Sequence, residues 1–226
     1  MRKPPAPSSA SSGAETLPPL PTPPLLLITD RTLARGDLAE VVAAACAGGC
    51  RWVSLREKDL PAAEQIALFA RLRSATAPFG ARLTLHGSPE LALAAGADGV
   101  HLSGGGDAKA ARALLGPGVL IGLSTHTLAE AAAADPAALD YITASPVFLT
   151  RSKPGHGPAL GLEGLSAFAR TSAVPVVALA GINSATAATC IAAGARGVAV
   201  MGGVMRADPP ESEVISLIAA MVERPT

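Results

Sequence analysis

Aromatic side chains are scarce in this 226-residue chain, at 3% of its residues, and its charges leave no excess of either sign. Eighteen Lys and Arg residues balance eighteen Asp and Glu residues. A nucleic-acid site normally needs a basic surface and, for single strands, aromatic rings on which bases stack. The composition therefore argues against a nucleic-acid partner.

Long apolar runs and paired cysteines are also missing. No uncharged apolar run reaches the length of about 18 residues that a membrane-spanning helix needs, and Met1-Arg2-Lys3 leads into prolines instead of the apolar core of a signal peptide. Cys46, Cys50 and Cys190 are odd in number and form no cluster with histidines, which is typical of core residues in a reducing compartment. These absences predict a soluble cytoplasmic protein that binds no membrane.

Prolines are concentrated at the amino terminus. Residues 1–24 hold eight of the twenty prolines, with Ser and Ala between them. Such a segment buries too little apolar surface to offset its chain entropy, so a disordered tail is predicted there. Residues 25–226 are predicted to form one domain, for which a hydrophobic content of 49% provides a sizeable core.

Short apolar runs alternate with alanine-rich stretches throughout residues 25–226. The apolar runs predict eight strands, over residues 25–30, 51–56, 82–86, 99–103, 120–124, 141–144, 175–179 and 197–201. The stretches between them predict eight helices, over residues 37–48, 61–76, 89–95, 107–115, 127–135, 161–171, 184–193 and 210–223.

An internal repeat supports this alternation. The segments 47–53, 95–100 and 193–198 each place Gly at the end of a helix and then start a strand. The first two lie about 48 residues apart and the third about twice that distance further on, which corresponds to a strand roughly every 24 residues. Apolar strands that alternate strictly with helices are typical of a parallel sheet. We therefore predict a single (β/α)8 TIM barrel, with an open doubly wound sheet as the alternative.

Polar residues gather where the predicted strands end, which is where barrels of this kind place their active sites. Arg56-Glu57-Lys58 ends the second strand, and Thr150-Arg151-Ser152-Lys153 follows the sixth. The last two strands lead into Ala180-Gly181-Ile182-Asn183 and Met201-Gly202-Gly203, whose backbone amides can face an anion. Cations, hydroxyls and glycine turns at one end of a barrel predict an enzyme that acts on a phosphate ester.

Seven segments together resemble the thiamine phosphate synthase and thiazole tautomerase family, in the same order and from about Leu25 to the end of the chain. They are Leu27-Ile28-Thr29-Asp30, Ser54-Leu55-Arg56-Glu57-Lys58, Ala97-Asp98-Gly99-Val100-His101-Leu102, Ser124-Thr125-His126, Asp140-Tyr141-Ile142, Pro146-Val147-Phe148-Leu149-Thr150-Arg151-Ser152-Lys153 and Val177-Ala178-Leu179-Ala180-Gly181-Ile182. The resemblance implies a TIM barrel that binds thiazole phosphate in thiamine biosynthesis.

The resemblance also implies roles for matching positions. In the synthase, a pyrimidine diphosphate loses pyrophosphate and the resulting carbocation is captured by the thiazole nitrogen. The cations that stabilise the leaving pyrophosphate match Arg56, Lys58 and Lys153. The cradle for the thiazole phosphate matches the side chains of Thr150 and Ser152 and the amides of Gly181, Gly202 and Gly203. Ser54 stands at a substrate-binding position where the family usually has Gln.

Two departures concern magnesium. Where the synthase has Asn-Asp followed by Asp or Arg, this chain has His86-Gly87-Ser88, and where it has a second acidic ligand after Gly-Gln, this chain has Ser103-Gly104-Gly105-Gly106-Asp107. Asp107 replaces that ligand only after a shift of one residue, and a single carboxylate holds magnesium weakly.

These departures place tautomerase-like chemistry first among our expectations. The tautomerase isomerises a carboxythiazole phosphate by moving a proton, and His126 suits that acid–base step without a metal. Two alternatives stay open: a Mg²⁺-dependent thiamine phosphate synthase, in which Asp107 is the metal ligand, and a non-catalytic phosphate-binding relative. His126 also matches a histidine of the synthases, so it does not discriminate between them. A homo-oligomer is neither indicated nor excluded.

Overall fold

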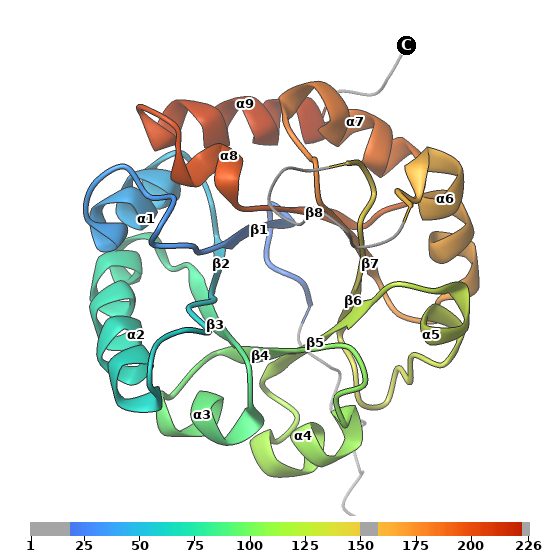
Figure 1. Cartoon of the computed structure of the whole chain (residues 1–226), viewed down its shortest axis with the longest axis horizontal. Helices are drawn as coiled ribbons and strands as arrows, with labels where there is room; N and C mark the ends of the chain where they lie inside the picture. The colour runs from blue at the N-terminus through green and yellow to red at the C-terminus, as the bar shows by residue number, and fades with distance from the viewer. Residues whose placement is uncertain (1–18, 150–157, 223–226) are drawn as a thin grey trace, which may run out of the picture.

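The computed structural model describes residues 19–149 and 158–222 and shows a closed barrel of eight parallel strands that pair in chain order (Figure 1). The prediction of a TIM barrel is confirmed, and the alternative of an open sheet is wrong because β1 also pairs with β8. The strands are β1 (Leu25–Ile28), β2 (Trp52–Leu55), β3 (Arg82–His86), β4 (Gly99–Leu102), β5 (Leu120–Thr125), β6 (Tyr141–Ala144), β7 (Val176–Leu179) and β8 (Gly197–Val200).

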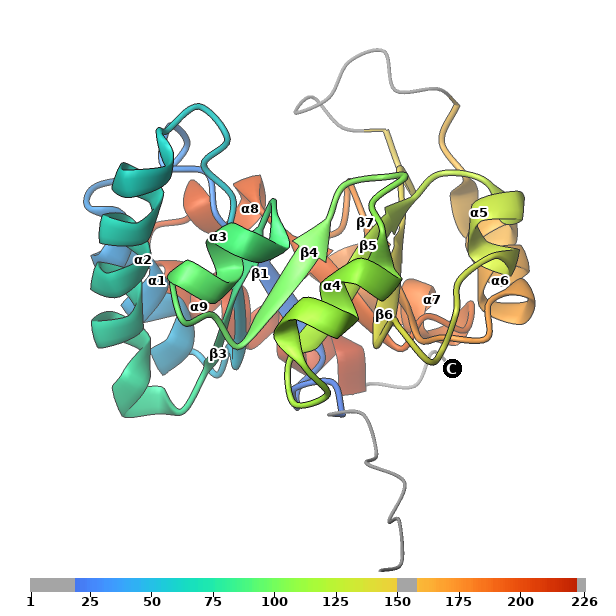
Figure 2. The same cartoon turned by 90° about the horizontal axis from the view of Figure 1, so that it is seen from below.

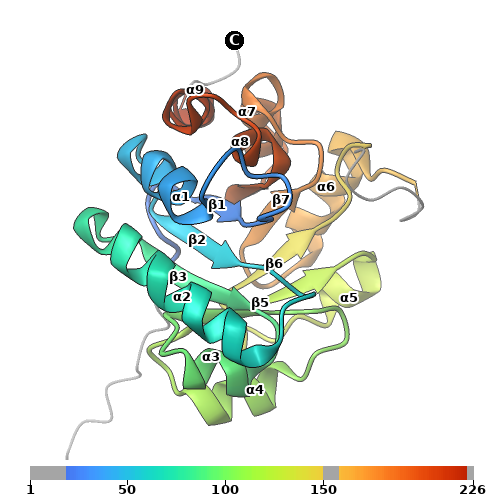
Figure 3. The same ribbon diagram turned by 60° about the vertical axis from the view of Figure 1, so that its left-hand side comes forward.

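Helices surround the barrel, as α1 and α2 illustrate outside β2 and β3 in Figure 3. They are α1 (Leu38–Ala47), α2 (Ala62–Thr76), α3 (Pro89–Ala94), α4 (Ala108–Leu115), α5 (Leu128–Ala132), α6 (Gly161–Thr171), α7 (Ser184–Ala192), α8 (Gly202–Met205) and α9 (Pro210–Val222), with a 3₁₀ turn η1 (Ala77–Phe79). The sequence predicted all of them except α8 and η1, which are a single short turn each. Within the described ranges, no helix is both long and apolar enough to cross a membrane.

Alternation along each strand divides the core into two parts. Leu25, Leu27, Val53 and Leu55 point outward and pack in the large layer between barrel and helices. The residues between them point inward, and a second buried cluster fills the barrel toward the amino ends of the strands: Leu26, Ile28, Trp52, Leu120, Tyr141, Val177 and Ala199. We call these seven residues the floor of the barrel.

The floor depends on a glycine. Trp52 and Tyr141 meet edge to face, with ring centroids 4.7 Å apart. A Cβ atom on Gly122 of β5 would lie 2.1 Å from the Tyr141 ring, so only Gly leaves room for it. Leu20 packs against the floor from outside the strands, and Pro24 O accepts a hydrogen bond from Val198 N–H. Ordered packing therefore begins before Leu25, whereas the rest of the predicted tail, residues 1–18, lies outside the described residues.

An Arg–Asp ion pair connects α2 to the start of β4. Asp98 Oδ2 accepts hydrogen bonds from the Arg73 guanidinium of α2, at 2.6 Å, and from Leu83 N of β3, at 2.7 Å. One carboxylate thus ties a helix to two strands.

The same arrangement recurs two strands further on. Asp140 Oδ2, just before β6, accepts hydrogen bonds from the Arg112 guanidinium of α4, at 2.7 Å, and from Ile121 N of β5, at 2.6 Å. The second pair is the more buried, since the Asp140 side chain is 1% exposed and the Asp98 side chain 35%. Two even-numbered strands are therefore held at their starts by the same kind of contact.

Candidate active site

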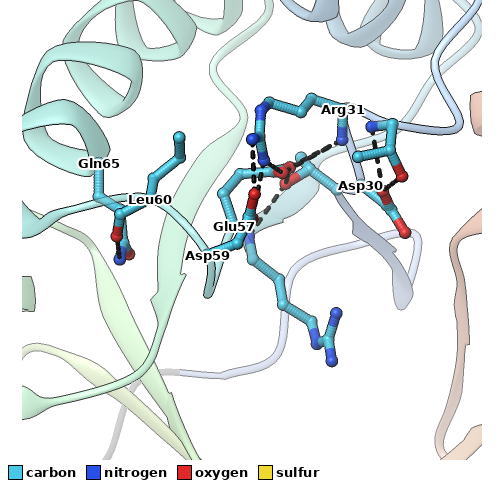
Figure 4. Close-up of polar contacts among 9 residues, drawn as sticks. Asp30, Arg31, Glu57, Asp59, Leu60 and Gln65 are labelled. Atoms are coloured by element: carbon cyan, nitrogen blue, oxygen red, sulfur yellow. Dashed lines mark hydrogen bonds and ion pairs between the residues drawn. The ribbon is translucent and has the colours of Figure 1, made fainter.

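The carboxyl ends of the strands form the end of the barrel opposite residues 19–24 (Figure 2), and we call this end the mouth. Glu57, directly after β2, is 3% exposed there. Its carboxylate accepts hydrogen bonds from Thr29 Oγ1, at 2.8 Å, from Arg31 N, at 3.0 and 3.2 Å, and from the Arg31 guanidinium, at 3.1 Å. Arg31 also donates to Asp59 Oδ1 and Oδ2, at 2.8 and 2.6 Å (Figure 4). We call Thr29, Arg31, Glu57 and Asp59 the Glu57 network.

This network fixes the backbone that carries two predicted site residues. Arg56 N donates to Thr29 Oγ1 at 2.9 Å, so the segment Arg56-Glu57-Lys58 is held on both sides of Glu57. The side chains of Arg56 and Lys58 form no ion pair with any residue in 19–149 or 158–222. The pKa of Lys58 is lowered, first because its ammonium loses part of its water and second because the Arg56 guanidinium lies nearby. Two neighbouring cations whose charges are not neutralised form a local site for an anion.

A polar layer lies above the floor inside the barrel. His101 Nδ1 is 3.0 Å from the Tyr141 hydroxyl, and His101 Nε2 is 3.0 Å from Ser124 Oγ. The His86 ring lies beside His101, with centroids 5.0 Å apart. Burial raises the pKa of Tyr141 far above its ordinary value, so the phenol keeps its proton. The chain Tyr141–His101–Ser124 thus connects the floor to the mouth through hydrogen bonds.

Ser54, which the sequence predicted to bind substrate, belongs to this layer. It lies two residues after the inward-pointing Trp52, and its side chain therefore faces the barrel interior. Ser54 is 1% exposed, and Ser54 Oγ, Thr143 Oγ1 and Trp52 Nε1 have no hydrogen-bond partner among the described residues. Buried polar atoms usually have partners, so the interior offers unused hydrogen-bonding groups to a polar heterocycle or water.

His126, directly after β5, is held in one tautomer. Its Nδ1 lies 2.7 Å from Ser145 O, a carbonyl that can only accept, so Nδ1 carries a hydrogen. Its backbone N–H donates to Glu130 Oε2 at 2.6 Å, within the capping box that starts α5. Nε2 is therefore the nitrogen that can gain or release a proton, which is the arrangement that acid–base catalysis needs.

The predicted phosphate glycines occupy crowded positions after β7 and β8. Gly181 has φ +70°, and a Cβ atom there would lie 2.6 Å from Phe148 Cβ. A Cβ atom on Gly202 would lie 2.5 Å from the Arg206 guanidinium, whereas Gly203 is exposed. Arg206 was not among the predicted site residues. Its spacing of four from Gly202 would have indicated it only if the short helix α8 had been predicted.

Three predicted residues, Thr150, Ser152 and Lys153, lie outside the described ranges. Their predicted contacts to a phosphate or pyrophosphate group stay predictions. The described chain stops before them at Leu149, which is 82% exposed.

The magnesium site implied by the resemblance does not fit the described residues. Asp107 is the N-cap of α4, and its Oδ1 accepts a hydrogen bond from Ala110 N at 3.0 Å. His86-Gly87-Ser88 provides no carboxylate after β3, where Ser88 caps α3. Within the described part of the chain, no group of three or more His, Cys, Asp or Glu side chains could hold a metal ion.

Two surface hollows lie away from this mouth. One, of about 500 Å³, is lined by Arg73, Arg82, Asp98, Val119 and neighbouring residues at the amino ends of β3, β4 and β5. The other, of about 240 Å³, lies among Pro23, Pro24, α7 and α9. Because the carboxyl ends of barrel strands carry the catalytic groups in this fold, we place the candidate site at the mouth and not in either hollow.

Comparisons with known proteins agree with the fold and with the resemblance. The family described as thiamine monophosphate synthase matches residues 25–204. A thiamine-phosphate synthase of Roseiflexus sp. (strain RS-1) is 40% identical over 86% of this chain and 84% of its own length. A thiamine-phosphate synthase of Albidiferax ferrireducens is 42% identical over 82% of this chain and 86% of its own length.

A solved structure also matches. The thiamine phosphate pyrophosphorylase of Pyrococcus furiosus superposes with a TM-score of 0.77 at 32% identity, over 87% of this chain and 94% of that one.

Proposed function

Since the chain belongs to the thiamine monophosphate synthase family, we propose that it is a thiamine phosphate synthase, a transferase that joins hydroxymethylpyrimidine diphosphate to thiazole phosphate. The names of the relatives favour this alternative over the tautomerase that the sequence placed first. The structural observation that supports it is the pair Arg56 and Lys58, two cations without an acidic partner in the described chain.

The proposed reaction needs cations at this place. The bond between the pyrimidine methylene carbon and the diphosphate oxygen breaks, and its electron pair leaves with pyrophosphate. The thiazole nitrogen then supplies the electrons of the new C–N bond. Negative charge develops on the leaving oxygen, and Arg56 and Lys58 stabilise it in the transition state.

Other residues would hold the two substrates. The thiazole phosphate would lie against the amides of Gly181, Gly202 and Gly203, with Arg206 as a cation beside them. The pyrimidine would enter the barrel, where Ser54 and Thr143 present unused hydroxyl groups.

Thiazole tautomerase activity is the second candidate, because His126 Nε2 has no hydrogen-bond partner among the described residues and Asp107 is engaged in a helix cap. In that reaction His126 would move a proton on the carboxythiazole ring and no metal would be needed. The test is isomerisation of carboxythiazole phosphate by wild type and His126→Asn.

A product assay separates these functions. Purified protein is mixed with hydroxymethylpyrimidine diphosphate and thiazole phosphate, and the amounts of thiamine phosphate and pyrophosphate formed are measured. We expect the two products in equal amounts. Lys58→Gln should lower kcat/KM by about 10²-fold or more, because one charge-stabilising donor is lost. Lys109→Gln, an exposed change on α4, is the matched control and should leave the rate unchanged.

Two results would contradict the synthase. Isomerisation without condensation would favour the tautomerase, and phosphate binding without turnover of either substrate would favour a non-catalytic relative. A cytoplasmic location, which buried reduced thiols would suit, remains part of the proposal, as does the binding of thiazole phosphate.

A further inference from the structure

We propose that this chain binds the diphosphate of its substrate as a metal-free anion, through side-chain cations and not through a magnesium ion held by protein carboxylates. The inference rests on the synthase function proposed above and concerns the same mouth.

Five of the described carboxylates near the strand ends already have partners. Glu57 accepts four hydrogen bonds in the Glu57 network, and Asp59 binds Arg31 with both oxygens. Asp107 caps α4, and Glu130 completes the capping box of α5. Asp30 binds the backbone and hydroxyl of Thr32 through one oxygen, at 3.1 and 2.6 Å. A hard divalent cation needs several oxygen ligands at one place, and these groups are used separately.

The backbone also disfavours a metal-binding side chain at two positions of the loops after β3 and β4, Gly87 and Gly106. Gly87 has φ +156°, at the edge of the region that side chains avoid. A Cβ atom on Gly106 would lie 2.9 Å from Leu102 Cβ and 3.1 Å from Ser103 O. Glycine at these two positions is therefore built into the loops after β3 and β4.

Cations at the mouth remain available. Arg56 and Lys58 have no ion-pair partner in the described ranges, and the pKa of Lys58 is lowered, first by partial loss of water around its ammonium and second by repulsion from the Arg56 guanidinium. A polyanion between them removes that repulsion and forms charge-assisted hydrogen bonds. The Glu57 network holds their backbone in place before the anion arrives.

Calorimetric titration of the full chain with sodium pyrophosphate tests the proposal, once with excess chelator and once with excess Mg²⁺. We expect binding with chelator and no tighter binding with excess Mg²⁺, because Mg²⁺ complexes pyrophosphate in solution and competes with the protein for the free anion. Arg56→Gln and Lys58→Gln should each weaken metal-free binding by at least about tenfold, whereas Lys109→Gln should not change it.

Asp107→Asn is the decisive variant. Asn caps helices as well as Asp does, so this change keeps the fold and removes only the charge. We expect unchanged pyrophosphate binding with and without Mg²⁺. Binding that needs Mg²⁺ in wild type, or a Mg²⁺ effect that disappears in Asp107→Asn, would overturn the proposal, and so would a lack of binding under both conditions.

The readout is independent of turnover. Metal-free binding of pyrophosphate together with no formation of thiamine phosphate would refute the proposed function and leave this inference standing. Formation of thiamine phosphate together with pyrophosphate binding that requires Mg²⁺ would do the reverse.

Discussion

Glu57 links the sequence motif Arg56-Glu57-Lys58 to the geometry of the mouth. Its neighbours Arg56 and Lys58 have no ion-pair partner among the described residues, while its own carboxylate is buried and binds Thr29 and Arg31. A buried carboxylate is stable only when its oxygens are satisfied, and here three different donor groups satisfy them. The residue therefore holds the backbone of the candidate site in place.

Replacement of Glu57 by Gln should lower the free energy of unfolding by about 1–3 kcal/mol, because hydrogen bonds to a charged acceptor are lost at a buried position. Asp59→Asn, which changes the exposed half of the same network, should cost less, because water screens this pair. Urea unfolding of both variants measures the difference. Equal losses would mean that burial of the Glu57 carboxylate is not what stabilises the network.

Some site residues could be read from the sequence and others could not. Arg56 and Lys58 were predicted because they follow an apolar strand. Asp107 stands before an alanine-rich stretch, which is a typical position for a helix N-cap, and an aspartate used as an N-cap is less available as a metal ligand. The bonds of His101 to Tyr141 and Ser124 join three strands, and no spacing along the chain reveals such contacts.

At the scale of elements, two Arg–Asp pairs repeat with different burial. Asp98 and Asp140 each accept one guanidinium and one strand N–H, and each precedes an even-numbered strand. The sequence did not show this repeat, because the glycine segments include Asp98 but not Asp140, and the arginines lie 25 and 28 residues from their partners.

The two pairs allow a matched comparison. Asp140→Ala should destabilise the protein by about 3–5 kcal/mol, because it leaves the Arg112 guanidinium, 13% exposed, without its buried partner. Asp98→Ala should cost about 1–2 kcal/mol, since Arg73 is 36% exposed and water can replace the lost bond. The shift in urea midpoint of each variant checks this order, and a larger loss for Asp98→Ala would contradict it.

Strand and helix positions were predicted to within a few residues, since buried parallel strands are short apolar runs and glycine closely follows α1, α3, α4 and α7. The exceptions are instructive. The helix α8 was read as a turn because Met201-Gly202-Gly203 contains no helix-forming pattern, and its four residues depend on contacts with the loop after β1, such as Arg35 N to Met205 O at 3.1 Å.

At the scale of the whole molecule, all three cysteine side chains are buried in the core. Burial raises the pKa of Cys46 to about 12 and those of Cys50 and Cys190 to about 11. The thiolate is the reactive form, so the native protein should not react with a thiol reagent near pH 8.5. All three cysteines should react in guanidinium chloride, and rapid labelling of the native protein would show that the packing opens locally.

The floor of the barrel also limits the order in which ligands can bind and leave. Leu26, Trp52, Tyr141 and their neighbours fill the barrel toward the amino ends of the strands, so in the described chain a ligand can approach the interior only from the carboxyl ends. Whatever sits deepest must arrive first and depart last. Two reactants that bind one above the other in a site with a single access route cannot bind or leave in either order. Steady-state kinetics would therefore show a compulsory order of substrate addition and product release.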